Sequence, residues 1–264
     1  MTLGRSVGLN PNAFRHPLDS DLTRLVRGTT GGLEGLVRLG VRSLVEPFSR
    51  LENLAFGVRV SDCHLHSLLV EACDTLDVRV PELYVRQDPL PNAYTLAFRG
   101  ETSIVATSAL VSLLSDDELR AVFGHELGHI KCEHSVWLSV AGIAWPNVPV
   151  FGQTILSPLL ADWRRAAEYT CDRAALLVVK DPKIVTSALL KLLSGLEDPP
   201  DPATFLSQAR DYENTLRGAN PLVRSLFASQ KLSRLTHPLP LQRVAELDKW
   251  GASSAYAAAL ARIK

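Results

Sequence analysis

The stretch Ala121-Val122-Phe123-Gly124-His125-Glu126-Leu127-Gly128-His129-Ile130 contains the pattern His-Glu-x-x-His. On an α-helix, at about 100° per residue, His125 and His129 lie one turn apart on one face, so their imidazoles can converge on one metal ion. A catalytic zinc takes three protein ligands and one water, whose pKa it lowers toward neutrality. Glu126, beside the open position, is the predicted general base and acid. The alternative is a coincidental histidine pair on a helix.

The residues before this stretch predict where its helix begins. Ser115-Asp116-Asp117-Glu118 reads as a capping box, with Ser115 as N-cap and Glu118 three residues later. Acidic residues in the first turn also favour the helix dipole. The apolar spacing continues the helix to about Glu133, which supports the metal-site interpretation.

Composition limits the classes of function. A chain of 264 residues, 46% of them hydrophobic, can bury a substantial core. Its 28 basic and 28 acidic residues cancel, so no net field attracts nucleic acid, and we expect no nucleic-acid partner. Residues 1–17 lack the apolar region of a signal peptide. We therefore expect a cytoplasmic protein with reduced, buried cysteines, and leave membrane association open.

Residues 1–58 are predicted to form a helical extension before a catalytic domain at 59–264. Helices are expected around 19–26 and 33–44, separated by the glycine-rich residues 28–32. The second of these helices is apolar on most sides. Packing on the main domain is favoured over contact with a membrane surface.

Short β-rich segments precede the metal-binding helix. An amphipathic helix is expected at 62–76, followed by strands at 82–86, 93–98 and 102–106. These predict a small antiparallel sheet. An exposed edge strand next to a zinc cleft can bind an extended peptide through main-chain hydrogen bonds.

Residues 135–161 contain no charged side chain and by length alone could be a transmembrane span. A single span would place candidate ligands of one metal on opposite sides of the bilayer. We therefore predict a buried helix followed by a proline-rich loop that includes Pro158, and no integral span.

A helix rich in alanine and leucine is predicted at 164–177. In it, Glu168 and Asp172 lie one turn apart. One carboxylate can complete a His/His/Glu ligand set while the other accepts the second N–H of a ligand imidazole. The alternative is an ordinary solvated acidic pair. His134 fits a helix end or a contact behind a ligand better than a metal ligand, and Cys171 is expected to point away from this face.

The remaining segments are predicted to be helical, at 183–196, 203–216, 222–228 and 239–250. His237, just before a helix that starts with proline, and Arg243 could together stabilise a developing oxyanion. A plain helix cap at Thr236 is the alternative.

Taken together, these residues resemble the HtpX-like and CAAX-prenyl-endopeptidase family of gluzincin zinc metallopeptidases. The resemblance covers about residues 60 to 250 and combines His-Glu-x-x-His with Glu-x-x-x-Asp, an upstream Asn-Ala-Tyr and a late His-Pro. It implies that His125, His129 and Glu168 bind one zinc ion per chain and that Glu126 is the catalytic base. It also implies that Asp172 orients a ligand histidine. Substrate binding on the edge strand is implied for Asn92, Ala93 and Tyr94, and stabilisation of the tetrahedral intermediate for His237 and Arg243.

The expected fold is therefore α+β and mainly α, a zincin-like domain with a small antiparallel sheet beside the His-Glu-x-x-His helix. The expected function is zinc-dependent hydrolysis of peptide bonds in a polypeptide substrate. The chain lacks the clear membrane spans of integral members, so it resembles a soluble or peripheral relative. The alternatives are a non-catalytic or latent zinc-binding scaffold and a zinc hydrolase for other substrates.

Overall fold

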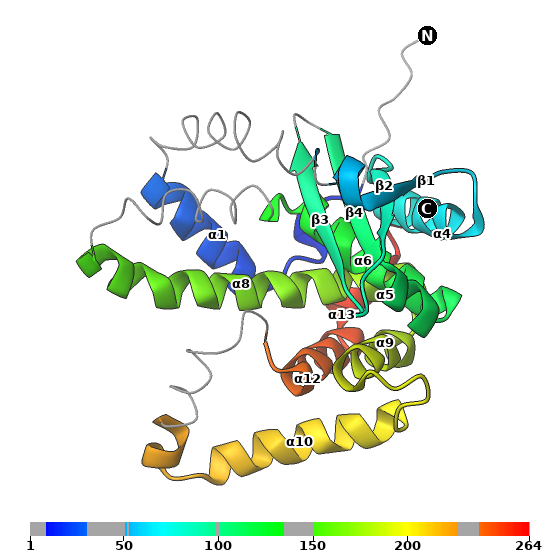
Figure 1. The fold of residues 1–264 in the computed structure, drawn as a ribbon. Helices are drawn as coiled ribbons and strands as arrows, with labels where there is room; N and C mark the ends of the chain where they lie inside the picture. The colour runs from blue at the N-terminus through cyan, green and yellow to red at the C-terminus, as the bar shows by residue number, and fades with distance from the viewer. Residues whose placement is uncertain are drawn as a thin grey trace.

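The computed structural model describes residues 9–30, 51, 53–98, 101–134, 150–225 and 238–263. Within these, a four-stranded sheet lies on one side of a central helix and further helices pack on that helix from its other sides (Figure 1). The mainly helical α+β fold is thus confirmed. The elements are η1 (Pro11–Ala13), α1 (Pro17–Thr30), β1 (Gly57–Val60), α4 (His64–Leu76), β2 (Glu82–Arg86), β3 (Ala93–Phe98), β4 (Glu101–Thr107), α5 (Ser108–Leu113), α6 (Asp116–Lys131), α8 (Val150–Val179), α9 (Pro182–Ser194), α10 (Pro202–Gly218), α12 (Pro240–Gly251) and α13 (Ser254–Leu260).

Helix α6 carries the His-Glu-x-x-His pattern and lies at the centre of the fold. The predicted capping box is confirmed: the Ser115 hydroxyl accepts from the Glu118 N–H, and the Glu118 carboxylate accepts from the Ser115 N–H. Phe123 and Leu127, one turn apart, are fully buried. Each contributes roughly 1.5–3 kcal/mol through burial of its apolar surface. Packing against α4, α8, α9 and β3 therefore fixes how α6 is rotated.

Two glycines let α8 approach α6 closely. A Cβ at Gly124 would lie 2.9 Å from a Val178 methyl carbon, and one at Gly128 would lie 3.0 Å from the Cys171 Cα. Ordinary carbon–carbon contacts are about 3.5–4.0 Å, so larger residues would push the helices apart. Because each glycine directly precedes a histidine of the motif, the close approach occurs where α8 presents Glu168 and Asp172.

The sheet differs from the expected antiparallel arrangement. Its strand order is β1-β2-β4-β3. The pairs β1–β2 and β3–β4 are antiparallel, but β2 and β4 run parallel. The chain reverses between β2 and β3 and again between β3 and β4, so the strand that pairs with β2 has the same direction. The sheet is therefore mixed, and β3 lies at its edge.

Helix α8 also differs from the sequence-based expectation. It is helical from Val150 to Val179 and includes Pro158, so a proline-rich loop at that point is wrong. One proline removes a single backbone hydrogen bond, and the leucines and alanines after it are strong helix formers. No helix among the described residues is long and apolar enough to cross a membrane. The predictions for 33–44 and 135–149 lie outside the described residues.

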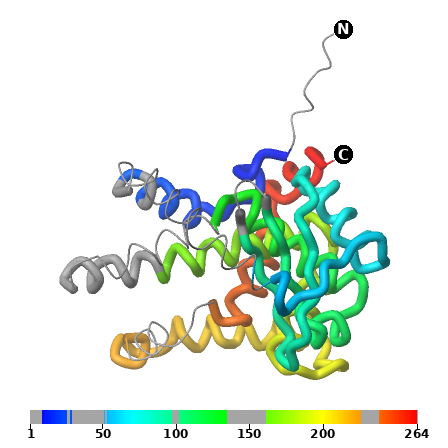
Figure 2. Tube along the Cα trace, turned by 45° about the horizontal axis from the view of Figure 1, so that its top comes forward, coloured from blue at the N-terminus to red at the C-terminus, as the bar shows by residue number. Residues whose placement is uncertain are grey.

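The helices outside the centre are arranged around α8. The described part of α1 packs on α8, and α12 packs on α8, α9 and α10. Helices α1, α8 and α10 extend from the body of the protein in the same general direction (Figure 2). The N-terminal α1 and the C-terminal α12 therefore both contact the helix that faces the histidines.

Candidate metal centre

His125 and His129 of α6 face Glu168 of α8. The Nε2 atom of His125 lies 3.4 Å from one Glu168 carboxylate oxygen, and the Nε2 atom of His129 lies 3.6 Å from the other. The histidine side chains are 14% and 13% exposed and that of Glu168 is 8% exposed. The structure thus brings together the two histidines and the distant glutamate that sequence spacing singled out.

These distances fit the ligands of one zinc ion. Zinc bound tetrahedrally at 2.0–2.1 Å from nitrogen and oxygen places neighbouring ligand atoms about 3.4 Å apart. Charge also fits a divalent cation. The carboxylates of Glu126, Glu168 and Asp172 line one cavity with a single guanidinium, that of Arg243.

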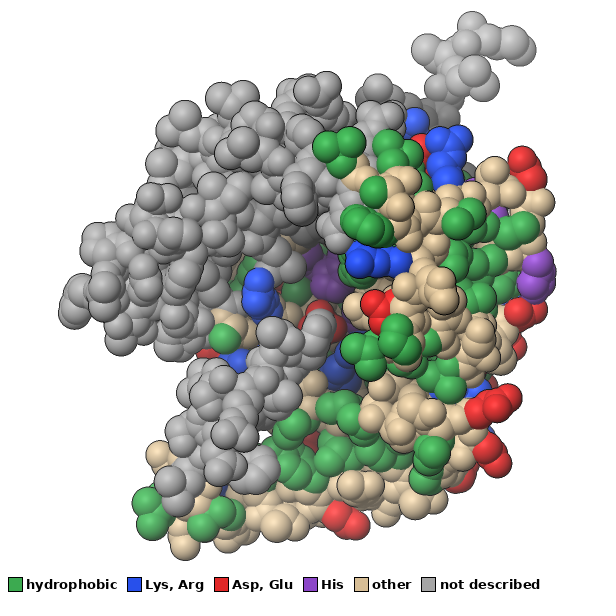
Figure 3. Space-filling model, in the orientation of Figure 1, with side chains coloured by type: hydrophobic (Ala, Val, Ile, Leu, Met, Phe, Trp, Pro, Cys, Tyr) green, Lys and Arg blue, Asp and Glu red, His purple; other side chains and the backbone are tan. Residues whose placement is uncertain are grey.

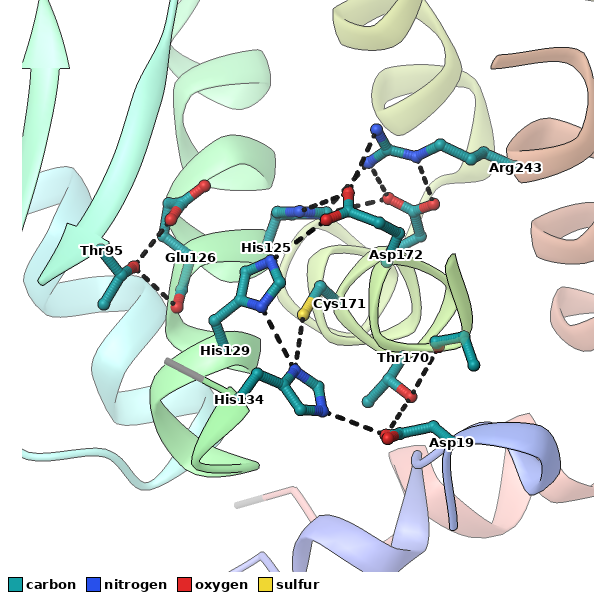
Figure 4. A network of polar contacts seen from close by, with 12 residues as sticks. Asp19, Thr95, His125, Glu126, His129, His134, Thr170, Cys171, Asp172 and Arg243 are labelled. Carbon is teal, nitrogen blue, oxygen red and sulfur yellow. Dashed lines mark hydrogen bonds and ion pairs between the residues drawn. The ribbon is translucent and has the colours of Figure 1, made fainter. Parts of the chain in front are cut away.

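Asp172 holds the other side of the His125 ring. Its Oδ1 lies 3.1 Å from His125 Nδ1, while Arg243 of α12 donates to both Asp172 oxygens, at 2.8 and 2.5 Å (Figure 4). Burial opposes ionisation of Asp172, but Arg243 and His125 outweigh it and lower the pKa of Asp172. For His125, burial lowers the pKa, whereas hydrogen bonds to Asp172 and Glu168 raise it to about 10. The pair therefore keeps the Nδ1 proton of His125 directed at Asp172.

Glu126 is held by a residue that no sequence motif indicated. The Thr95 hydroxyl on β3 lies 2.7 Å from Glu126 Oε2 and 3.3 Å from the Glu126 carbonyl oxygen (Figure 4). The edge strand is thereby tied to the carboxylate beside the two histidines. A lone threonine in a strand carries no spacing signal, so this contact appears only through the packing of β3 on α6.

A cavity of about 210 Å³ opens onto these side chains. His125, Glu126, Glu168 and Arg243 form its polar side. Its apolar wall comes from α6 and α9, from Val122, Val185, Ala188, Leu189 and Leu192. Figure 3 shows histidine and acidic side chains near the centre of this face. The cavity thus pairs polar groups with space for an apolar side chain.

The three residues expected to bind substrate do not all line the cavity. Asn92 and Ala93 line the cavity, whereas Tyr94 is not among its lining residues. The Asn92 main chain is engaged by β4, since its N–H donates to the Thr107 hydroxyl and its carbonyl accepts from the Thr107 N–H, both at 2.9 Å. His237, the expected oxyanion donor, lies outside the described residues.

Cys171 was expected to point away from the helix face that carries Glu168 and Asp172, and this expectation is wrong. Its thiol lies within 4.8 Å of ligand atoms of both His125 and His129. Three residues along a helix amount to about 300°, so Cys171 is only about 60° from Glu168 around α8. Burial raises the pKa of this thiol well above its ordinary value, so the thiol is protonated in the metal-free protein. The two histidines thus have both a thiol and, at 3.4 and 3.6 Å from their Nε2 atoms, the Glu168 carboxylate as neighbours. Cys63, also expected to be buried, is exposed.

Two facing helices that bring a pair of imidazoles against a glutamate, next to an edge strand, form the arrangement expected of a metallopeptidase. Residues 61–251 match the family model described as peptidase family M48. The chain therefore belongs to peptidase family M48.

The sequences of similar proteins agree with this assignment. The chain is 45% identical over 268 residues to the plastoglobule-localized metallopeptidase 48, chloroplastic, of Arabidopsis thaliana, covering 96% of this chain and 76% of that protein. It is 24% identical to a protease HtpX homolog of Salinibacter ruber, covering 84% and 89% respectively. The crystal structure of S. mikatae Ste24p has a similar fold, with a TM-score of 0.51 and 14% identity, covering 87% of this chain and 62% of that one.

Proposed function

We propose that this metallopeptidase is a zinc-dependent endopeptidase in which His125, His129 and Glu168 hold one zinc ion. The observation that carries the proposal is the Glu168 carboxylate, whose two oxygens lie 3.4 and 3.6 Å from the Nε2 atoms of the two histidines. Zinc at this position would lower the pKa of a water molecule and polarise the carbonyl of the scissile peptide bond. Asp172 would orient His125.

Glu126 is the proposed general base and acid. Thr95 donates to Glu126 Oε2, so we assign Oε1 to proton transfer. With Oε2 fixed, the carboxylate cannot rotate freely away from the cavity. The carboxylate would take the proton of the attacking water and deliver it to the leaving amine.

The edge strand β3 is the proposed binding site for the substrate main chain. Main-chain groups of successive residues in a strand point to alternate sides. Because the N–H and carbonyl of Asn92 point toward β4, those of Ala93 and Thr95 point toward the open edge. An extended peptide would pair with Ala93 and Thr95, which puts its scissile bond beside Glu126.

Arg243 has a proposed role in holding the carboxylates. Its guanidinium binds both Asp172 oxygens and lies 3.5 Å from a Glu168 oxygen. We propose that its main role is to hold the carboxylates of Asp172 and Glu168, and that stabilisation of a developing oxyanion is a smaller role. His237 remains a proposed donor to that oxyanion.

The test is hydrolysis of unfolded casein by the zinc-loaded protein, by the chelated protein and by Glu126→Gln. We expect Glu126→Gln to retain one zinc per chain and to lose about 10²- to 10⁴-fold in kcat. Glu197→Gln, at an exposed glutamate between α9 and α10, is the matched control and should behave as wild type. Retained hydrolysis in Glu126→Gln would exclude the base assignment. Wild-type protein that binds zinc and cleaves nothing would favour the scaffold alternative.

We also propose a cytoplasmic location with peripheral contact to a lipid surface. Large hydrophobic side chains are exposed just before and within β1, with Leu54 61%, Phe56 64% and Val58 71% exposed. The Arabidopsis relative is plastoglobule-localized by name. In flotation with lipid vesicles, Phe56→Gln should reduce binding, whereas Leu222→Gln, at an exposed leucine after α10, should not. Wild-type protein that stays at the bottom of the gradient would refute this contact.

A further inference from the structure

The second motif histidine, His129, has its own orienting chain, which ends in the N-terminal helix α1. His129 Nδ1 lies 3.2 Å from His134 Nδ1, and His134 Nε2 lies 3.1 Å from Asp19 Oδ2 (Figure 4). His134 and Asp19 are both fully buried. Asp19 lies outside residues 61–251, which match the family model. A residue from outside that region therefore contacts the metal centre through one side chain.

The chain of contacts permits only one arrangement of protons if His129 binds metal through Nε2. His129 Nδ1 then carries a proton and donates it to His134 Nδ1. His134 must therefore carry its own proton on Nε2, which it donates to the Asp19 carboxylate. In metal sites, a ligand histidine is commonly oriented in this way by a hydrogen-bond partner that is itself held by a further hydrogen bond.

The local backbone delivers His134 to this position. Helix α6 ends at Lys131, Cys132 is its C-cap, and Glu133 adopts φ 58°, in the left-handed region. The chain therefore turns back directly after the helix. The rings of His134 and His129 meet edge to face, with centroids 5.3 Å apart. A left-handed conformation at a residue other than glycine costs about 1–3 kcal/mol, so surrounding contacts must favour it.

Asp19 is in turn held on several sides. The Thr170 hydroxyl donates to Oδ2 at 2.8 Å, and the Thr23 hydroxyl donates to Oδ1 at 3.0 Å. Trp163 Nε1 donates to the Thr23 hydroxyl at 3.0 Å. Arg15 Nε lies 3.7 Å from Asp19 Oδ2 and gives a compensating positive charge. The carboxylate that receives the His134 proton is thus fixed by α1 and α8 together.

We propose that Asp19, acting through His134, is a positioning residue for His129, so that helix α1 forms part of the metal centre. This inference rests on the proposed zinc site. It predicts that loss of the Asp19–His134 contact weakens zinc binding beyond any effect on stability. A purely structural α1 would change stability and leave zinc affinity alone.

The experiment measures zinc affinity by competition with a chromophoric chelator, and the absorption spectrum of the Co²⁺-substituted protein, on the full chain. Asp19→Ala and His134→Phe should each weaken zinc binding about 10- to 100-fold and alter the Co²⁺ spectrum. His134→Gln, whose amide can both accept from His129 and donate to Asp19, should recover most of the affinity. Thr186→Val is the control: it removes the hydrogen bond from the buried Thr186 hydroxyl to the Pro182 carbonyl within α9, which involves neither His134 nor Asp19. It should lower only the melting temperature of the metal-free protein.

Zinc affinity in Asp19→Ala and His134→Phe equal to that of Thr186→Val would overturn the proposal. Should Asp19→Ala not fold, Asp19→Asn, which keeps the shape and loses the charge, is compared with Thr186→Val on the same criterion. Failure of the underlying zinc site looks different, because then Glu168→Ala would bind zinc as tightly as wild type.

Discussion

Gly128→Ala tests whether the close approach of α6 and α8 determines the metal centre. The added Cβ would lie 3.0 Å from both the Cys171 Cα and the Ala174 Cβ. Relief to an ordinary contact requires a movement of roughly 0.5–1 Å. Cys171 lies between Glu168 and Asp172, so the movement carries both carboxylates. Metal sites tolerate about 0.2 Å in ligand distance, so zinc affinity should fall on the order of 10- to 100-fold.

Two opposing effects determine the stability of the Gly128→Ala variant. Overpacking costs about 1–3 kcal/mol, while alanine in place of glycine within a helix gains about 0.5–1 kcal/mol. The net loss in the free energy of unfolding should be about 0–2.5 kcal/mol. Gly218→Ala is the matched control, since Gly218 ends α10 and its added Cβ meets nothing within 4 Å. That variant should gain up to about 1 kcal/mol and bind zinc normally.

The two variants are compared by urea denaturation of the metal-free protein and by zinc competition with a chelator. Gly128→Ala that is as stable as Gly218→Ala and binds zinc as tightly would refute the reasoning. A loss of stability alone, with zinc affinity intact, would show that α8 moves without carrying its carboxylates.

Three further changes test other contacts. Glu168→Ala should lose its zinc on dialysis while its circular dichroism spectrum is retained, and a wild-type metal content would remove Glu168 from the ligand set. Thr95→Val should keep zinc but lower kcat about 10- to 100-fold, because a hydrogen bond to the charged Glu126 contributes about 1.5–3 kcal/mol. An unchanged kcat would show that Thr95 has no role in catalysis. Burial opposes ionisation of Glu118, but hydrogen bonds from side chain and backbone donors, including Lys191, outweigh it and lower its pKa below 4.5. The stabilisation that the Glu118 carboxylate gives is then complete above pH 4.5 and is lost as the pH falls through the lowered pKa. Thermal denaturation should therefore show Glu118→Gln to be less stable than wild type at pH 7 and equally stable in acid.

The sequence was sufficient where a local pattern carries the information. The capping box at Ser115, the α6 helix and the three predicted strands need only neighbouring residues, and each was confirmed, whereas strand β1 was not predicted. Residue spacing also singled out Glu168, which lies one turn from Asp172 on a helix rich in alanine and leucine, and the structure brings its carboxylate to the histidines.

Long-range contacts between residues without a motif were not predicted. Thr95 meets Glu126 across 31 residues, and Asp19 meets His134 across 115. Nothing in a single threonine or aspartate distinguishes these from surface residues. The parallel pairing of β2 with β4 was missed for the same reason, because strand patterns give hydrophobic faces and leave the pairing partner open.

The two orienting chains have a consequence for how the protein matures. Each bridges a large gap in the sequence: Asp172 reaches Arg243 across 71 residues, and His134 reaches Asp19 across 115. Each of these contacts can form only after the long loop between its two residues has closed. A half-folded molecule would therefore hold its histidines without their supports. Peptide cleavage should therefore begin only once folding is complete.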